Sequence, residues 1–129
     1  MENKSTGYKV NKYSFETKRY CQTLDLKDDP QLISEYISKH SEEQFSEEIM
    51  EGMRKVGILD MDIYISGNKL FMIVETRLDF EWEKAFTELA SLPGQQEWED
   101  TVSIFQQVKE GASSSEKWQL MDRIFRIYK

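Results

Sequence analysis

The sequence ILDMDIYISGNKLFMIVET, residues 58–76, contains the clearest structural signal in the chain. Apolar and polar side chains alternate in its first half, which is the pattern of a half-buried strand. Gly67 and Asn68 then provide the residue types that tight hairpin turns prefer. The second half is apolar enough for a central strand. The stretch therefore predicts an antiparallel β-hairpin with strands over 58–66 and 69–76.

The segments around this hairpin predict further strands and helices. Apolar residues of one parity indicate a strand over 19–26. The Asp-Asp-Pro sequence at 28–30 announces a helix, because Asp suits the N-cap and Pro the first helical position. Apolar residues at helical spacing continue to Gly57, with a kink or restart expected at Ser41-Glu42-Glu43. Later segments predict, in order, two helices and a last strand, over 80–90, 97–108 and 118–128.

The order of these elements is β-α-β-β-α-α-β, which predicts a fold of the α+β class. It is the order of the ferredoxin-like split βαβ arrangement, with an antiparallel sheet and helices on one face. An apolar outer face of such a sheet needs a cover, and a second copy of the chain is the usual one. The sequence thus predicts a homodimer whose sheets face one another, with Trp118 at the seam.

The length and composition of the chain predict its domain organisation and limit the kinds of partner that it can bind. The 129 residues fit one domain over 18–129, and the polar residues 1–17 are expected to form a loose arm. A net charge of −7 without a basic run disfavours nucleic acid as a partner. The single cysteine, Cys21, excludes a disulfide framework and favours a reducing cytoplasm. No stretch is long and apolar enough to cross a membrane.

The only histidine of the chain, His40, follows Tyr36 by one helical turn, so both rings share one helix face. The unperturbed pKa of histidine lies nearest to neutrality, at about 6.5. His40 is therefore the natural candidate for a proton relay near pH 7. The alternative is that His40 only ends the helix and interacts with its carbonyl end.

A pocket between the helices and the sheet could hold Tyr36, His40, Met61 and Trp98. Aromatic faces beside one acid–base group suit a small polar ligand such as a sugar. The alternative is that Trp98 is ordinary core and Tyr36 a half-buried helix residue. Nucleotide-binding glycine motifs are absent from the sequence, and one histidine is a poor basis for a metal site.

Several motifs together resemble the L-rhamnose mutarotase family. They are SEYISKH at 34–40, with its Tyr-x-x-x-His helix, and VGILDMDIYISGNKLFMIVE at 56–75. The second stretch contains a glycine link, a strand ending in Ile-Tyr, a hairpin and the pattern Phe-x-x-Val-Glu. Each motif is short, but their order and spacing are specific, and the similarity extends over about residues 19–128.

The resemblance implies a dimeric ferredoxin-like α/β barrel that interconverts the anomers of a deoxy-hexose without cofactor or metal. It implies that His40 is the catalytic proton donor, acting on the ring oxygen, and that Tyr36 binds sugar. Met61 stands where the family usually has a second sugar-contacting tyrosine. Glu97 and Trp98 stand where it usually has paired tryptophans, so only Trp98 is retained. The resemblance implies L-rhamnose or a related 6-deoxy sugar as the substrate, and these departures indicate an altered preference, toward another 6-deoxy sugar.

Two other functions fit the same fold. The departures at Met61 and Glu97 are compatible with a non-catalytic homodimeric module that only binds a sugar. A cofactor-free oxygenase rests on analogy of fold alone. Anomer exchange by the wild-type protein separates the mutarotase from both.

Overall fold

The computed structural model describes residues 2–41, 45–108 and 111–128. Its sheet has four antiparallel strands in the order β2-β3-β1-β4. The strands are β1 (Thr17–Asp25), β2 (Ile58–Ser66), β3 (Lys69–Arg77) and β4 (Gln119–Leu120). The helices are α1 (Pro30–Lys39), α2 (Glu47–Lys55), α3 (Trp82–Ala90), α4 (Gln95–Ser103) and α5 (Ser114–Lys117). This element and strand order confirms the predicted α+β class and is consistent with a ferredoxin-like sheet.

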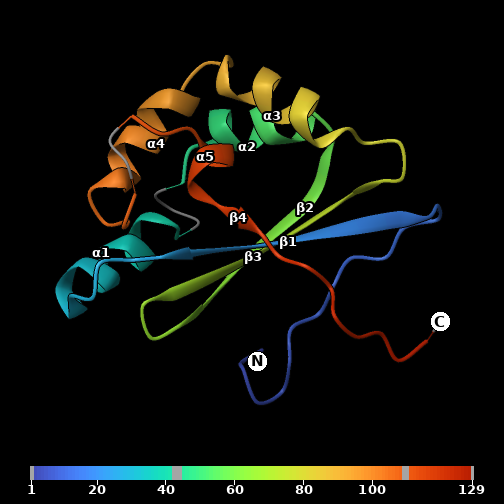
Figure 1. Cartoon of the computed structure of the whole chain (residues 1–129), viewed down its shortest axis with the longest axis horizontal. Helices are drawn as coiled ribbons and strands as arrows, with labels where there is room; N and C mark the ends of the chain where they lie inside the picture. Colours follow the sequence, from blue (N-terminus) through green and yellow to red (C-terminus); the bar gives the residue numbers. More distant parts are fainter. Residues whose placement is uncertain (1, 42–44, 109–110, 129) are drawn as a thin grey trace.

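The helices occupy one side of the sheet. Helices α2, α3, α4 and α5 lie over one face, and α1 follows the end of β1 (Figure 1). The hairpin of β2 and β3 forms as predicted, turning at Gly67, which has a φ of +62°. Strand β3 lies between β1 and β2 and presents alternate residues to the helices. The core formed there includes Leu24, Leu70, Met72, Val74, Phe86, Val102 and Phe105.

Helix α1 begins where the sequence predicts. The Asp29 carboxylate accepts hydrogen bonds from the backbone N–H groups of Gln31 and Leu32, at 2.9 and 3.1 Å. Two of the otherwise unpaired N–H groups of the first turn are thereby satisfied. The helix is 10 residues long and ends at His40, its C-cap. The cap at Asp29 thus sets the start of the helix that carries the candidate proton relay.

The long helical pattern after residue 30 forms two helices, α1 and α2. The predicted restart lies near Ser41, while Glu42 and Glu43 lie outside the described residues. Helix α2 ends at Lys55 with Val56 as its C-cap, and Gly57, the predicted stop, follows with a φ of +104° that favours glycine. This residue leads the chain directly into β2 and so places the hairpin against α2.

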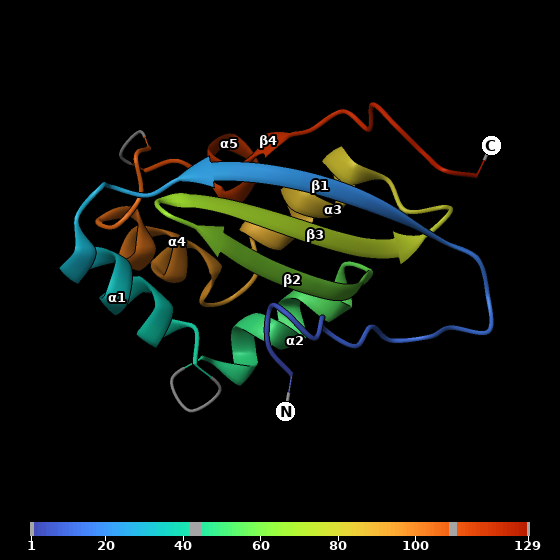
Figure 2. The ribbon, with the colours of Figure 1, turned by 90° about the horizontal axis from the view of Figure 1, so that it is seen from below.

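The predicted last strand over 118–128 is wrong for most of its length. Only Gln119 and Leu120 pair with β1 in the described chain, and the segment 121–128 leaves the body of the molecule (Figures 1 and 2). Ile124 is 96% exposed. Because these apolar side chains are exposed and the described residues form no surface over them, the pattern alone does not make a strand. Trp118, expected at a dimer seam, is instead buried in the core.

The residues before β1 lie across the side of the sheet opposite to the helices (Figure 1). Residues 2–16 contain neither a helix nor a ladder strand. Their side chains are mostly exposed, and contacts to β2 hold them: the Asn11 amide donates to Asp60 at 3.1 Å, and Tyr8 contacts the ring of Tyr64. Among the described helices, none combines the length and apolar character needed to cross a membrane.

Candidate active site

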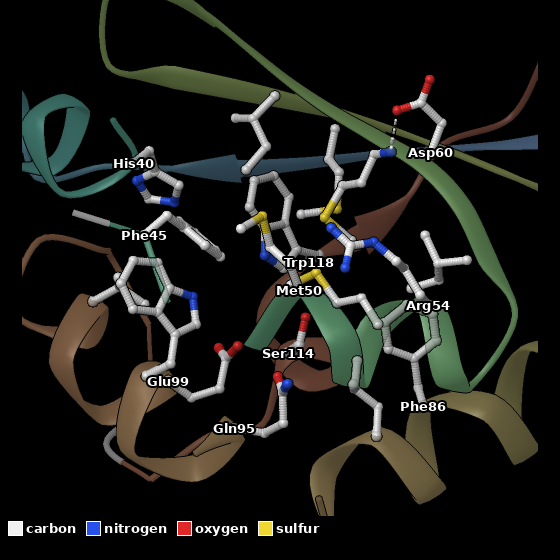
Figure 3. A pocket seen from close by; sticks show the side chains of 18 of the residues that line it. His40, Phe45, Met50, Arg54, Asp60, Phe86, Gln95, Glu99, Ser114 and Trp118 are labelled. Carbon is white, nitrogen blue, oxygen red and sulfur yellow. Dashed lines mark hydrogen bonds between the residues drawn. The ribbon is translucent and has the colours of Figure 1, made fainter. Parts of the chain in front are cut away.

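A cavity of about 620 Å³ lies between the helix-facing side of the sheet and the surrounding helices (Figure 3). This size falls within the usual range for small-molecule sites. All four predicted site residues line it: Tyr36 and His40 from α1 and the residue that caps it, Met61 from β2, and Trp98 from α4. The structure therefore brings together side chains that are far apart in the sequence, although their role in sugar binding stays a prediction.

The wall of the cavity combines a large apolar part with a few polar groups. The polar lining residues are Tyr36, His40, Arg54, Asp60, Gln95, Glu99, Gln106 and Ser114. The larger apolar ones are Phe45, Met50, Met53, Met61, Met72, Phe86, Trp98 and Trp118. Such a mixture suits a ligand that has both hydroxyl groups and an apolar face.

The imidazole of His40 is fixed by its own helix. Nδ1 lies 2.8 Å from the backbone carbonyl oxygen of Tyr36, so this nitrogen carries the hydrogen that the carbonyl accepts. The ring packs among the rings of Tyr36, Trp98 and Phe45, at centroid distances of 4.4, 5.1 and 5.6 Å. Nε2 is consequently the nitrogen available for chemistry. His40 ends α1 and also lines the cavity, and its role as a proton relay stays a prediction.

Burial sets the protonation of the groups on α1. It lowers the pKa of His40 from its ordinary 6.5, and the hydrogen bond to the Tyr36 carbonyl opposes this only in part. His40 is therefore mostly neutral at pH 7, with a free lone pair on Nε2. The Tyr36 phenol is 3% exposed, and burial raises its pKa well above 10.0. A hydrogen bond to Gln106 acts in the opposite direction, and the phenol keeps its proton near neutral pH.

An ion pair in the same wall was not anticipated from the sequence. Lys117 Nζ lies 3.0 Å from Oε1 of Glu99 and donates a hydrogen bond to the Glu99 backbone oxygen at 2.7 Å. The Lys117 side chain is fully buried, whereas that of Glu99 keeps 13% exposure. Burial raises the pKa of the Glu99 carboxyl, and Lys117 lowers it by a smaller amount. Glu99 lies three residues before the buried Val102, a spacing that places both on one helix face but does not reveal the lysine partner.

Two glutamines complete the polar side of the cavity. The Gln95 amide donates to the backbone oxygen of Ile49 at 3.1 Å and so connects α4 to α2. Oε1 of Gln106 is buried and has no hydrogen-bond partner within the described part of the chain. A buried acceptor without a donor is unusual, so Oε1 of Gln106 can accept a hydrogen bond from a hydroxyl group of a ligand. No group of three or more potential ligands among the described residues is placed to hold a metal ion.

Comparisons with known proteins agree with this geometry. The family model described as L-rhamnose mutarotase matches residues 19–127. An L-fucose mutarotase from Xanthomonas campestris pv. campestris is 31% identical over 109 residues, covering 84% of this chain and 87% of that protein. A UPF0734 protein from Dictyostelium discoideum is 34% identical over 118 residues, covering 88% of this chain and 93% of that protein.

A solved structure shows the same fold. The crystal structure of an L-rhamnose mutarotase from Formosa agariphila superimposes with a TM-score of 0.65 at 19% identity, covering 85% of this chain and 98% of that one. The family match spans the strands, the helices and all four predicted site residues. Mutarotases are isomerases that interconvert the anomers of sugars. The chain belongs to the L-rhamnose mutarotase family.

Proposed function

We propose that this protein interconverts the α and β anomers of a 6-deoxy sugar, L-rhamnose or L-fucose, by acid–base opening of the ring at His40. The observation that carries the proposal is the position of His40, whose free Nε2 belongs to the wall of a sugar-sized cavity. Family membership supports the reaction class, and the similarity to a protein named L-fucose mutarotase supports a 6-deoxy sugar as substrate.

Mutarotation moves two protons. One leaves the anomeric hydroxyl and one arrives at the ring oxygen, so that the bond between C1 and the ring oxygen breaks and the aldehyde forms. Rotation about C1–C2 and closure in the reverse sense give the other anomer. The lowered pKa of His40 favours a neutral imidazole that first accepts a proton at Nε2 and then returns it as an acid. No step of this sequence needs a cofactor.

The apolar lining suits the methyl group of a 6-deoxy sugar. Trp98 offers an indole face for the apolar side of the sugar ring. Met61 is part of a wall that also contains Met50 and Met53, where the thioether side chains can adapt to a methyl group. A hydroxymethyl group at the same place would leave its hydroxyl without a partner, which disfavours ordinary hexoses.

We further propose that the working form is a cytoplasmic homodimer. The outer face of the sheet carries partly buried apolar side chains such as Phe71 and Ile73. The tail beyond β4 exposes large apolar side chains, among them Ile124 at 96% and Phe125 at 77%. Apolar surface of this kind is usually covered by a partner, and a second copy would cover both regions. The cytoplasm fits the free thiol of Cys21.

Saturation-transfer NMR on L-rhamnose and L-fucose tests the activity directly, because it measures anomer exchange at equilibrium. We expect the wild-type protein to accelerate exchange of at least one of these sugars, and His40→Ala to lose about 10²–10⁴-fold. His40→Gln keeps the size of the side chain and serves as a second variant. Equal exchange rates for wild type and both variants would contradict the proposal. Dialysis against a metal chelator should leave the rate unchanged.

The second candidate is a sugar-binding module without catalysis. It is favoured by Met61 and Glu97, which stand where mutarotases of this family usually have aromatic residues. Tight binding of a 6-deoxy sugar without any acceleration of exchange would select this function.

A further inference from the structure

We propose that Glu99 is the second proton-transfer group of the site and shares one proton with His40, while Lys117 positions its carboxylate. This role rests on the proposed mutarotation, because ring opening needs one group to accept a proton and another to deliver one. His40 alone would have to serve two oxygens of the sugar in succession. A second group in the same cavity allows both transfers without exchange with solvent.

The other ionisable groups in the wall fit this task poorly. The Tyr36 phenol is buried and holds its proton too firmly to exchange it near neutral pH. Arg54 pairs with Glu47 at the surface, at 3.0 Å, and its guanidinium group offers only hydrogen-bond donors and no acceptor. Neither group can both accept and donate a proton under ordinary conditions.

The carboxylate of Asp60 is already occupied. One of its oxygens accepts from the backbone N–H of Met61 at 3.0 Å, and the other accepts from the Asn11 amide at 3.1 Å. These bonds hold Asp60 toward β2 and the N-terminal residues, far along the wall from Glu99 in Figure 3. Of the described lining residues, Glu99 is therefore the carboxyl best placed to face a ligand.

The position of the Glu99 side chain also supports its contact with a ligand in the cavity. Figure 3 shows its carboxylate directed into the cavity. It follows Trp98 on α4, and the Trp98 ring lies 5.1 Å from that of His40. A sugar stacked on Trp98 would thus have His40 on one side and Glu99 on another. Oε1 of this carboxylate lies 3.0 Å from Lys117 Nζ and has no other partner among the described groups.

The burial of the Lys117 ammonium group costs desolvation free energy, which its contacts with Glu99 must offset. Its side chain has no exposed surface, and an ion pair out of water is rarely more stable than apolar residues of the same volume. Lys117 comes from the four-residue helix α5 and reaches the Glu99 carbonyl and carboxylate together. This double contact fixes the direction of the Glu99 side chain, as a positioning residue should.

The protonation of the two groups suits a shared proton. Burial raises the pKa of the Glu99 carboxyl and lowers that of the His40 imidazole, so it favours the neutral form of both groups. A neutral carboxyl can donate a proton, and a neutral imidazole can accept one. Lys117 from α5, Asp100 on α4 itself and the phenol of Tyr36 from α1 are the other polar groups that act on this pair.

The proposed step balances. Nε2 of neutral His40 takes the proton of the anomeric hydroxyl while protonated Glu99 delivers its proton to the ring oxygen. The bond from C1 to that oxygen breaks, and C1 becomes the carbonyl carbon. Closure after rotation returns both protons to their donors. The pair carries one transferable proton before and after the cycle, so activity requires the singly protonated pair.

The test is Glu99→Gln, which keeps size and hydrogen bonding but cannot exchange a proton. We expect kcat for anomer exchange to fall about 10²–10⁴-fold with KM changed only a few-fold, and the bell-shaped pH profile of kcat/KM to lose one limb. Glu99→Asp, which keeps the carboxylate, should retain both limbs. Glu88→Gln on the exposed side of α3 is the matched control and should behave as wild type.

Lys117→Met separates positioning from catalysis. We expect it to lower kcat while keeping both limbs of the profile, with the limb of Glu99 moved to higher pH. Unchanged kcat and pH profile in Glu99→Gln, in a protein whose exchange is lost in His40→Ala, would overturn this role and leave the proposed function intact. A wild-type protein without exchange would overturn the proposed function itself.

Discussion

Nδ1 of His40 lies 2.8 Å from the backbone oxygen of Tyr36, one helical turn earlier, and the two rings pack 4.4 Å apart. This relationship fixes both the tautomer and the direction of the imidazole, because the helix end supplies the acceptor. Tyr36 therefore contributes to the site through its backbone and its ring as well as its hydroxyl. The spacing of four residues in the sequence thus acquires a physical meaning, because it joins the candidate proton relay to the end of the helix that carries it.

The stability of the fold should depend on the protonation of His40. Its pKa is lowered in the folded state, so the unfolded chain binds a proton more readily as the pH falls through about 6.5. Wild-type protein should lose free energy of unfolding between pH 7 and pH 5 relative to His40→Gln. Urea unfolding at both pH values measures this difference. A difference that does not change with pH would contradict the burial of His40.

Substitution of Trp98 should weaken sugar binding and leave the fold intact. Trp98→Leu removes the stacking face, and a loss of about 1 kcal/mol corresponds to a roughly fivefold increase in Kd. Titration calorimetry with the preferred sugar measures it. Trp82→Leu is the control, because Trp82 packs on Phe86 and Tyr20, at 4.2 and 4.5 Å, outside the cavity wall. Equal affinities of both variants would show that Trp98 is only core.

Gly52→Ala should destabilise the protein, although alanine is the better helix former. A Cβ atom at Gly52 would lie 2.7 Å from the Gln95 amide nitrogen, which is buried and donates to the Ile49 oxygen. Overpacking at such a contact costs about 1–3 kcal/mol, which exceeds the gain of about 1 kcal/mol in helix propensity. Chemical denaturation gives the comparison, with Glu51→Ala on the exposed side of the same helix as control. An increase in stability would mean that Gln95 moves freely.

The proposed homodimer predicts a molecular mass of twice 15.3 kDa in sedimentation equilibrium. Phe125→Glu places a charge in the exposed apolar tail, and Ile73→Glu places one in the outer face of the sheet. Both should shift the equilibrium toward the monomer, while Glu88→Gln should not. Sedimentation of the wild type as a monomer at all concentrations would contradict the dimer.

Local signals in the sequence predicted the elements that depend on local physics. Asp29 caps α1, Gly57 follows the end of α2 and Gly67 turns the hairpin, because each satisfies a requirement of its own few residues. The segment 121–128 could not be judged in this way, since its apolar residues form a strand only where another surface receives them.

In the candidate site, too, some residues could be identified from the sequence, and others depend on contacts between distant segments. His40 could be identified because it is the only residue of its type. Glu99 could not be separated from the other glutamates of the chain, because only the packing of α4 and α5 reveals which carboxylate meets a buried lysine. The burial of Trp118 in the core depends on residues that are distant in the sequence, so the sequence pattern could not distinguish this position from one at a dimer seam.

The four-residue helix α5 also has a consequence for biosynthesis. His40 leaves the ribosome early, yet Trp118, which lines the same cavity, and Lys117, which pairs with Glu99 of its wall, are translated much later. Contacts between such distant residues form slowly compared with local ones. A nascent chain interrupted before α5 would therefore contain His40 without Trp118 in the cavity wall and without Lys117 beside Glu99.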